Sequence, residues 1–244
     1  PGLDWLWREP APKPLPLHRI AEGGGVDAAA KLVLIEAKAN GGFAAGNNIG
    51  LRYIEACGDA SDVWLLNPDT LVAPGALAAM QVRMAADRRI GTCGAGHIGD
   101  GEYAEDPVDS AAVERDLGYV MGACLLASRA YLDRVGPMDE RYFLYFEEAS
   151  WQAKAGRRFR PALAADAVVY HHHHASGGRH ERYLYAGRLR FARYYKPWAV
   201  PSVGLGLVVA AWRAWRSGES ERMRLLRSPA FWWDALTRAA RPPA

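Results

Sequence analysis

Short apolar runs alternate with segments of helical periodicity through the first part of the chain. Residues 31–36, 62–66 and 90–95 are predicted to form buried strands. Apolar residues recur at helical intervals over 46–57, and helix formers that follow a proline fill 74–84. An order of strand, loop, helix and strand is typical of an α/β fold with a mostly parallel sheet.

The same alternation continues, less regularly, in the middle of the chain. We expect an exposed loop over 96–109 and then an apolar stretch at 119–128. A short helix is predicted over 129–135, and a further strand over 166–170. These elements extend the predicted α/β domain towards the last third of the sequence.

The two ends differ in composition from this central part. Residues 1–30 are proline-rich at the start and show no sustained period apart from a short helix around 3–8, so we expect an irregular segment. Near 176–179 the composition shifts towards Arg, Tyr and Trp. The sequence therefore predicts an α/β domain over 31–178 and a helical region over 179–244.

Composition narrows the class of protein. With 244 residues, half of them hydrophobic, the chain can bury a substantial core. A net charge of +3 is too small to indicate a nucleic-acid partner, so we expect none. The widely separated Cys57, Cys93 and Cys124 fit neither a zinc site nor a disulfide framework, which favours reduced thiols in the cytoplasm.

The first candidate site combines a Gly/Asn-rich turn, Asn40–Gly50, with Asp69. Glycines let the backbone approach a ligand closely, and side-chain amides offer donors and acceptors. Asp69 follows the predicted strand 62–66, so it should lie at the sheet edge where open α/β folds bind ligands. Each feature alone is more often a plain turn or a helix cap, but their order and spacing, together with later motifs, favour a site for a metal and a phosphate.

A second group of titratable residues lies further along the chain. Glu147 and Glu148 follow an aromatic stretch, and one of them could act as a general base whose pKa is raised by aromatic walls. The alternative is that both acids complement the dipole of a helix that they open. Four histidines begin at His171, at the end of the strand predicted over 166–170, where neutral imidazole beside a carboxylate would suit Mn²⁺.

Together these segments resemble the glycosyltransferase family 2 enzymes, in particular their bacterial rhamnosyltransferase-like branch. The resemblance covers about residues 31–195, and its ordered matches are Asn40–Gly50, Leu65–Thr70, Gly122–Leu126, Gly136–Glu148 and His171–Ser176. It implies a GT-A type three-layer α/β/α sandwich with a mostly parallel sheet, followed by a C-terminal helical appendage.

The resemblance implies inverting, metal-dependent transfer of a sugar such as rhamnose in cell-surface polysaccharide synthesis. The donor would be dTDP- or UDP-linked, and the acceptor a glycan or a lipid-linked glycan. Asp69 and His171 would hold Mg²⁺ or Mn²⁺, and Glu148, next to Glu147, would be the catalytic base. The implied donor-binding residues are Asn40, Gly42, Phe43, Gly46, Asn47, Asn48, Asn67 and Asp69, and the implied acceptor-binding residues are Gly122, Ala123 and Tyr145.

The chain also departs from the family pattern. Glu148 stands where the family has Asp, Ser150 where it has a further acid, and Lys154 where it has Arg. The family's first strands, which hold the base and ribose, are not found, so we expect an N-terminally incomplete domain. One alternative is therefore an impaired member that binds a glycan or a partner without catalysis. A nucleotidyltransferase is a weaker alternative, because no glycine-rich loop with Lys or Arg follows a first strand.

The C-terminal region contains an apolar segment, 199–211, flanked by aromatic and basic residues. It is shorter than the roughly 20 apolar residues that a membrane crossing needs. One interpretation is a helix lying on the inner face of the bacterial plasma membrane near a lipid-linked acceptor, with 231–233 as a further anchor. The other is a helix packed on the catalytic domain or on a second copy of the chain.

Overall fold

The computed structural model describes residues 16–99, 118–171 and 181–237. The helix expected at 3–8, the loop beyond residue 99 and the composition change at 176–179 lie outside these residues.

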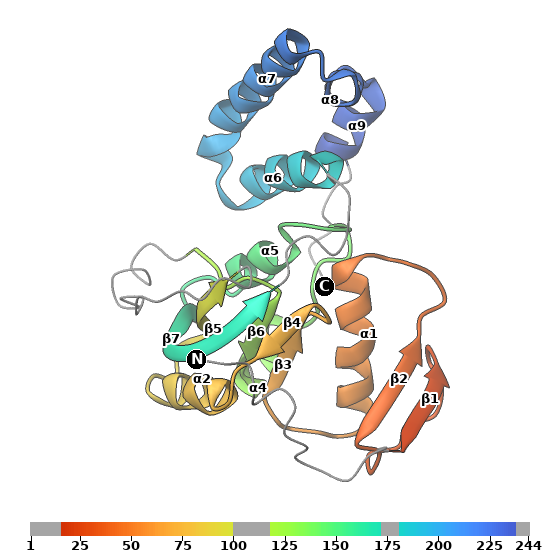
Figure 1. The fold of residues 1–244 in the computed structure, drawn as a ribbon, viewed down its shortest axis with the longest axis vertical. Coiled ribbons are helices and arrows are strands. Elements are labelled where there is room, and N and C mark those ends of the chain that lie inside the picture. The colour runs from red at the N-terminus through yellow and green to blue at the C-terminus, as the bar shows by residue number, and fades with distance from the viewer. Residues whose placement is uncertain (1–15, 100–117, 172–180, 238–244) are drawn as a thin grey trace.

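A five-stranded sheet forms the centre of the α/β part (Figure 1), in the order β3-β6-β5-β7-β4. Strands β3, β5 and β7 run in the same direction, whereas β6 and β4 pair antiparallel to their neighbours. The bounds are β3 Val63–Leu66, β4 Thr70–Val72, β5 Ile90–Gly99, β6 Cys124–Ala127 and β7 Arg160–His171.

Helices cover both faces of this sheet. They are α1 (Phe43–Ala56), α2 (Ala76–Ala85), α4 (Arg129–Val135) and α5 (Glu147–Lys154). The alternation along β6 separates two cores: Cys124 and Leu126 pack in the core of α2, while Leu125 and Ala127 pack in the core of α1, α4 and α5. The predicted three-layer α/β/α arrangement is therefore confirmed.

The central strands are longer than the sequence predicts. β5 continues to Gly99, where a loop was predicted from residue 96, and β7 begins at Arg160, before the predicted start at 166. The reason is mutual pairing, because β5 and β7 form a parallel ladder from Ile90 and Arg160 to Gly99 and Tyr170. Small residues fill both strands and give little periodic signal.

The N-terminal segment contains a strand where the sequence predicts irregular structure. β1 (Leu17–Ala21) pairs in parallel with β2 (Leu32–Glu36), separately from the five-stranded sheet. Neither strand has a fully buried residue, so the predicted burial of the strand at 31–36 is wrong, and backbone pairing rather than core burial defines both strands. A strand of this kind leaves a weak hydrophobic signal.

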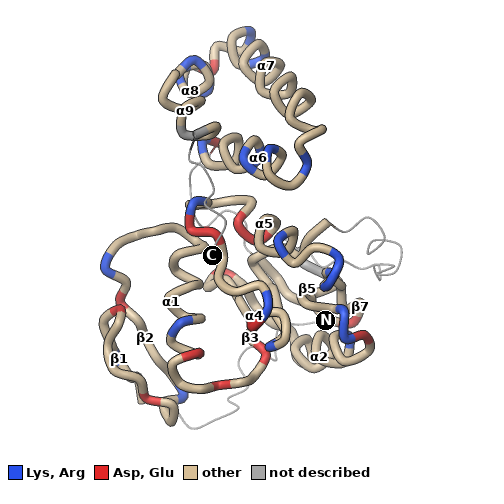
Figure 2. The backbone as a smooth tube through the Cα atoms, turned by 180° about the vertical axis from the view of Figure 1, so that it is seen from behind, with Lys and Arg blue, Asp and Glu red and all other residues tan. Residues whose placement is uncertain are grey.

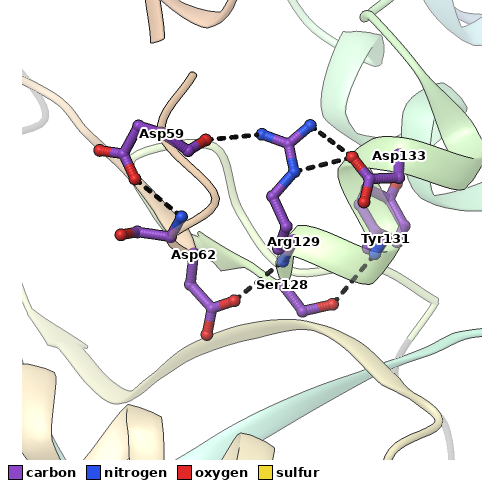
Figure 3. Close-up of polar contacts among 7 residues, drawn as sticks. Asp59, Asp62, Ser128, Arg129, Tyr131 and Asp133 are labelled. Carbon is purple, nitrogen blue, oxygen red and sulfur yellow. Dashed lines mark hydrogen bonds and ion pairs between the residues drawn. The ribbon is translucent and has the colours of Figure 1, made fainter. Parts of the chain in front are cut away.

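Polar contacts fix the start of α4 against the turn that precedes β3 (Figure 3). Ser128 caps the helix by accepting from the Tyr131 N–H at 3.2 Å, and Asp62 accepts from the Arg129 N–H at 2.8 Å. The Arg129 side chain pairs with Asp133 and donates to the Asp59 carbonyl. These contacts fix the position of α4 relative to β3, at the end of the sheet opposite the Asn67–Thr70 turn.

The C-terminal part is helical, as the sequence predicts. It consists of α6 (Glu181–Tyr195), the short η2 (Pro197–Ala199), α7 (Val200–Ser217), α8 (Ser220–Leu226) and α9 (Pro229–Thr237). These helices share a core that includes Leu189, Leu207 and Phe231, and α6 lies next to α5 (Figure 1). None of the helices in the described part of the chain is long and apolar enough to cross a membrane.

Candidate active site

The predicted metal ligands meet at one edge of the five-stranded sheet. β4 pairs with β7 so that Thr70 lies opposite His171. The Thr70 hydroxyl donates to the Asn67 carbonyl at 2.6 Å and closes the turn that contains Asp69. As a result, Asp69 Oδ1 lies 3.3 Å from His171 Nε2, and Asn67 Nδ2 lies 3.4 Å from the same nitrogen.

This arrangement fits a divalent cation. Neighbouring ligands of an octahedral cation with bonds of about 2.1 Å lie about 3 Å apart, close to the separation of the Asp69 oxygen and the His171 nitrogen. Among the described residues, no group of three or more His, Cys, Asp or Glu side chains could hold a metal. Asp69 and His171 could therefore supply two ligands, and the other positions would fall to a bound ligand and water.

The predicted acidic pair opens α5, where the backbone is strained. Tyr145 and Phe146, immediately before the helix, have φ values of 67° and 70°, which non-glycine residues rarely adopt. Such conformations persist only where surrounding contacts enforce them, and they often occur at functional sites.

Glu147 is buried, and Glu148 is half-buried with one carboxylate oxygen hidden from water. Burial, with the neighbouring Glu148 charge, raises the pKa of Glu147 to about 8. Burial also raises the pKa of Glu148, although backbone N–H groups, including those of Gly122 and Ala149, oppose this by hydrogen bonding to its carboxylate. Within the described structure, one buried oxygen of each carboxyl group has no hydrogen-bond partner. A buried polar atom of this kind calls for a ligand or a functional explanation.

Gly122 and Ala123 connect the acidic pair to the Asp69 turn. A Cβ added at Gly122 would lie 3.0 Å from the Phe43 ring and 3.7 Å from Glu148 Cβ. The next residue, Ala123, accepts a hydrogen bond from the Asn67 N–H at 3.0 Å. Two consecutive residues thus contact both halves of the candidate site.

The Gly/Asn-rich turn packs on the segment before the acidic pair. Gly42 has φ 89°, and a Cβ there would lie 2.0 Å from the Phe143 carbonyl oxygen. The same carbonyl accepts from the Phe43 N–H at 2.9 Å, and Asn40 Oδ1 accepts from the Gly42 N–H at 3.1 Å. Only glycine fits position 42, because both the φ value and the contact exclude a side chain.

Asn48 has a structural role in place of the predicted donor contact. Its buried side chain donates to the Met138 carbonyl at 3.0 Å and to Glu140 at 2.9 Å, and it accepts from the Met138 N–H. All of this hydrogen bonding is directed into the protein. Asn47 donates to the Phe43 carbonyl within α1, and Gly46 lies inside the same helix, where a Cβ would meet nothing within 4 Å.

Residues that the motifs did not identify support the acidic pair from α6. A Cβ at Gly187 would lie 2.9 Å from the Tyr145 carbonyl oxygen and 3.2 Å from the Phe146 ring. Arg190 donates to the Arg141 carbonyl at 2.9 Å. The sequence does contain one signal of this contact, because Gly187 is a glycine inside a helical pattern. Such a glycine destabilises a helix by about 1 kcal/mol relative to alanine, so it often has a packing reason.

Tyr145, an expected acceptor contact, is exposed beside the acidic pair. Gln152, another residue outside the motifs, links α5 to the segment before Gly122: it donates to the Val120 and Glu148 carbonyls and accepts from the Val120 N–H. The last motif match, His171–Ser176, continues beyond His171 into residues outside the described part of the chain.

No protein-family model matches the chain. A stretch of 44 residues, 18% of the chain, is 41% identical to an N-acetylglucosaminyl-diphospho-decaprenol L-rhamnosyltransferase of Mycobacterium tuberculosis, and the same enzyme from a second strain matches equally. The matched stretch spans only 14% of the length of these relatives. A solved mannosyltransferase from Pyrobaculum calidifontis, in complex with GDP-Man and Mn²⁺, aligns with a TM-score of 0.43 and 18% identity over 84% of this chain and 68% of that one. The chain thus combines an α/β fold with a segment similar to a known sugar transferase.

Proposed function

We propose that this chain is a glycosyltransferase of the family 2 type, which moves a sugar from a nucleoside diphosphate donor to an acceptor hydroxyl. The observation that carries the proposal is the junction at Gly122 and Ala123, which places Glu148 on one side and the Asn67–Thr70 turn on the other. A transferase needs a group that holds the diphosphate and a base that activates the acceptor, and the two halves of the site fit these tasks.

Asp69 and His171 would hold Mg²⁺ or Mn²⁺ at the diphosphate half of the site, with Asn67 beside them. When bound, the cation would neutralise the charge that develops on the leaving diphosphate. The glycine-rich turn contributes its backbone: Gly42 allows Phe43 to pack beside Gly122, next to Glu148.

Glu148 would take the proton from the acceptor hydroxyl as the hydroxyl attacks the anomeric carbon and the diphosphate departs from the opposite face. Hydrogen bonds from backbone N–H groups orient its carboxylate, and burial raises its pKa, which makes the ionised form a stronger base. Glu147, neutral below a pH of about 8, adds no second negative charge at neutral pH. The result is inversion at the anomeric carbon.

The local similarity to the mycobacterial relative bears on the substrates. That relative is named as a rhamnosyltransferase acting on a sugar diphosphate linked to decaprenol. We therefore propose rhamnose from a dTDP-linked donor, or a sugar from a UDP-linked donor, and a lipid-linked glycan acceptor used in cell-surface polysaccharide synthesis. Such a reaction would take place at the cytoplasmic face of the plasma membrane.

Calorimetric titration of the full chain with dTDP and UDP, with and without Mn²⁺, tests the donor site. We expect binding that requires Mn²⁺ and is lost in Asp69→Asn, because an amide is a weaker ligand for a hard cation than a carboxylate. Asp166→Asn is the matched control, since Asp166 is an exposed aspartate of β7 outside the site. Glu148→Gln should bind the nucleotide normally but lose transfer by about 10²- to 10⁴-fold. Nucleotide binding that is unchanged without Mn²⁺ and in Asp69→Asn, or the absence of nucleotide binding, would favour the non-catalytic alternative.

A further inference from the structure

One face of α7 is apolar and open to solvent. Leu205 and Val208 are 65% and 61% exposed, and Trp212 and Trp215, further along the helix, are 50% and 68% exposed. Trp198, just before the helix in η2, is 75% exposed. Scattered apolar residues on a surface are ordinary, but a contiguous set of this size marks an interaction surface.

These residues form a stripe because their spacing follows the helix. Positions 205, 208, 212 and 215 are three or four residues apart, so they lie on one side of α7. The opposite side carries Val203, Leu207 and Ala214, which are buried, and the first two pack in the core shared with α6, α8 and α9. The helix therefore has two apolar faces, and the described residues cover only one of them.

The charges next to the stripe are basic. Arg213 and Arg216 are exposed near the C-terminal end of α7, and the Arg216 guanidinium lies 5.1 Å from the centre of the Trp212 ring. Figure 2 marks Lys and Arg in blue on α7. Lys196 is exposed just before η2. The sequence of α7 contains no Asp or Glu. The stripe thus combines tryptophan, aliphatic side chains and positive charge without a nearby acid on the same helix.

We propose that this face of α7, together with Trp198, docks on a bilayer that contains anionic phospholipids. Tryptophan rings prefer the headgroup region, aliphatic side chains enter the acyl boundary, and arginine pairs with the phosphates. A second copy of the chain fits less well. In a two-fold contact with parallel α7 helices, Arg213 and Arg216 of both copies would approach each other, and in an antiparallel contact they would approach the end that carries Lys196. α7 supplies no carboxylate to pair with them in either case.

The docking surface is connected to the candidate active site through α6. α6 packs against α7 on one side and against α5 on the other, and its Gly187 contacts Tyr145 and Phe146 just before the acidic pair. The docked helix would thereby hold the site near a lipid-linked acceptor; this last step rests on the proposed function, whereas docking itself does not.

Flotation of the full chain with vesicles tests docking without nucleotide or acceptor, so its outcome is independent of the proposed activity. We compare vesicles of phosphatidylcholine alone with vesicles that also contain phosphatidylglycerol. The wild-type chain should float with the anionic vesicles, and Trp212→Ser/Trp215→Ser should reduce the apparent lipid affinity about tenfold or more. Val82→Ser is the matched control, because Val82 is 73% exposed on α2, in the α/β part of the molecule, and its loss should leave binding unchanged.

Circular dichroism and thermal unfolding of each variant establish that the chain is folded. Binding should weaken when the salt concentration rises, because screening reduces the attraction between arginine and phosphate. Equal binding of wild type and double variant would overturn the proposal, as would the absence of wild-type binding to anionic vesicles. A wild-type dimer that becomes monomeric in the double variant, with no vesicle binding by either, would assign the face to a second copy instead.

Discussion

At the scale of single residues, the raised pKa of Glu147 makes the stability of the fold depend on pH. Glu147 is buried and its pKa is raised to about 8, so the folded chain holds this proton where the unfolded chain, with an ordinary pKa near 4.5, releases it. Folding stability contributed by this group therefore falls as pH rises from about 4.5 to about 8, because the native state binds more protons than the unfolded state.

Glu147→Gln removes this pH dependence. The variant should match the wild type in stability below pH 5 and become progressively more stable than it up to pH 8, by an amount of the order of 1 kcal/mol for each pH unit. Urea unfolding of both proteins from pH 5 to 8 measures the difference. A difference that stays constant over this range would show that Glu147 does not hold its proton in the folded chain.

Asn48 shows at the same scale what a motif cannot predict. Its position in the Gly/Asn-rich run predicts a ligand contact, but its side chain bonds to Met138 and Glu140, 90 and 92 residues away. The motif indicates that the Asn48 side chain has specific hydrogen-bond partners, because a buried amide must be paired. It cannot tell whether those partners are a ligand or distant backbone, since that depends on the packing of α1 against the segment before α5.

At the scale of elements, the sequence predicts best where one core face imposes a period. The strand at 63–66 and the helix at 129–135 were predicted almost to the residue, because their buried positions repeat. β1 was not predicted, since pairing with β2 rather than burial forms it. The contact of α6 with the acidic pair also cannot be predicted from a local sequence pattern, because it joins segments about 40 residues apart.

That contact leads to a prediction about α6. Gly187→Ala would place a methyl group 2.9 Å from the Tyr145 carbonyl oxygen, which is too close, so the strained residues before Glu147 and Glu148 must shift. If α6 positions the acidic pair, kcat should fall about tenfold with little change in the KM for the donor, because small displacements of a catalytic group are costly. The pH profile of kcat should also change, since the burial of Glu148 changes.

The control for this variant is Gly206→Ala in α7, outside the candidate site. A Cβ at Gly206 meets nothing within 4 Å, so the alanine should stabilise its helix and leave kcat unchanged. A Gly187→Ala chain with wild-type kcat and pH profile would show that α6 is only a neighbour of the acidic pair and does not position it.

At the scale of the whole molecule, α7, whose apolar residues are exposed, and α5, which begins with the acidic pair, lie on opposite sides of α6 (Figure 1). The site alone would process an acceptor from solution. Docking through α7 would attach the chain to the bilayer that also holds the acceptor. This raises the effective concentration of the acceptor at the site, although the site gains no new contact with it. The two interpretations of the C-terminal region can thus be separated by the form in which the acceptor is presented.

We therefore expect transfer to a lipid-linked acceptor in anionic vesicles to be about tenfold or more faster in the wild type than in Trp212→Ser/Trp215→Ser. Transfer to a water-soluble acceptor analogue should be equal in the two proteins, because neither tryptophan lies in the site. Release of the nucleoside diphosphate measures both rates. A variant that loses both activities would point to damage of the site through α6, and one that keeps both would show that docking does not serve the reaction. Only selective loss on vesicles fits a transferase that uses α7 to reach its acceptor.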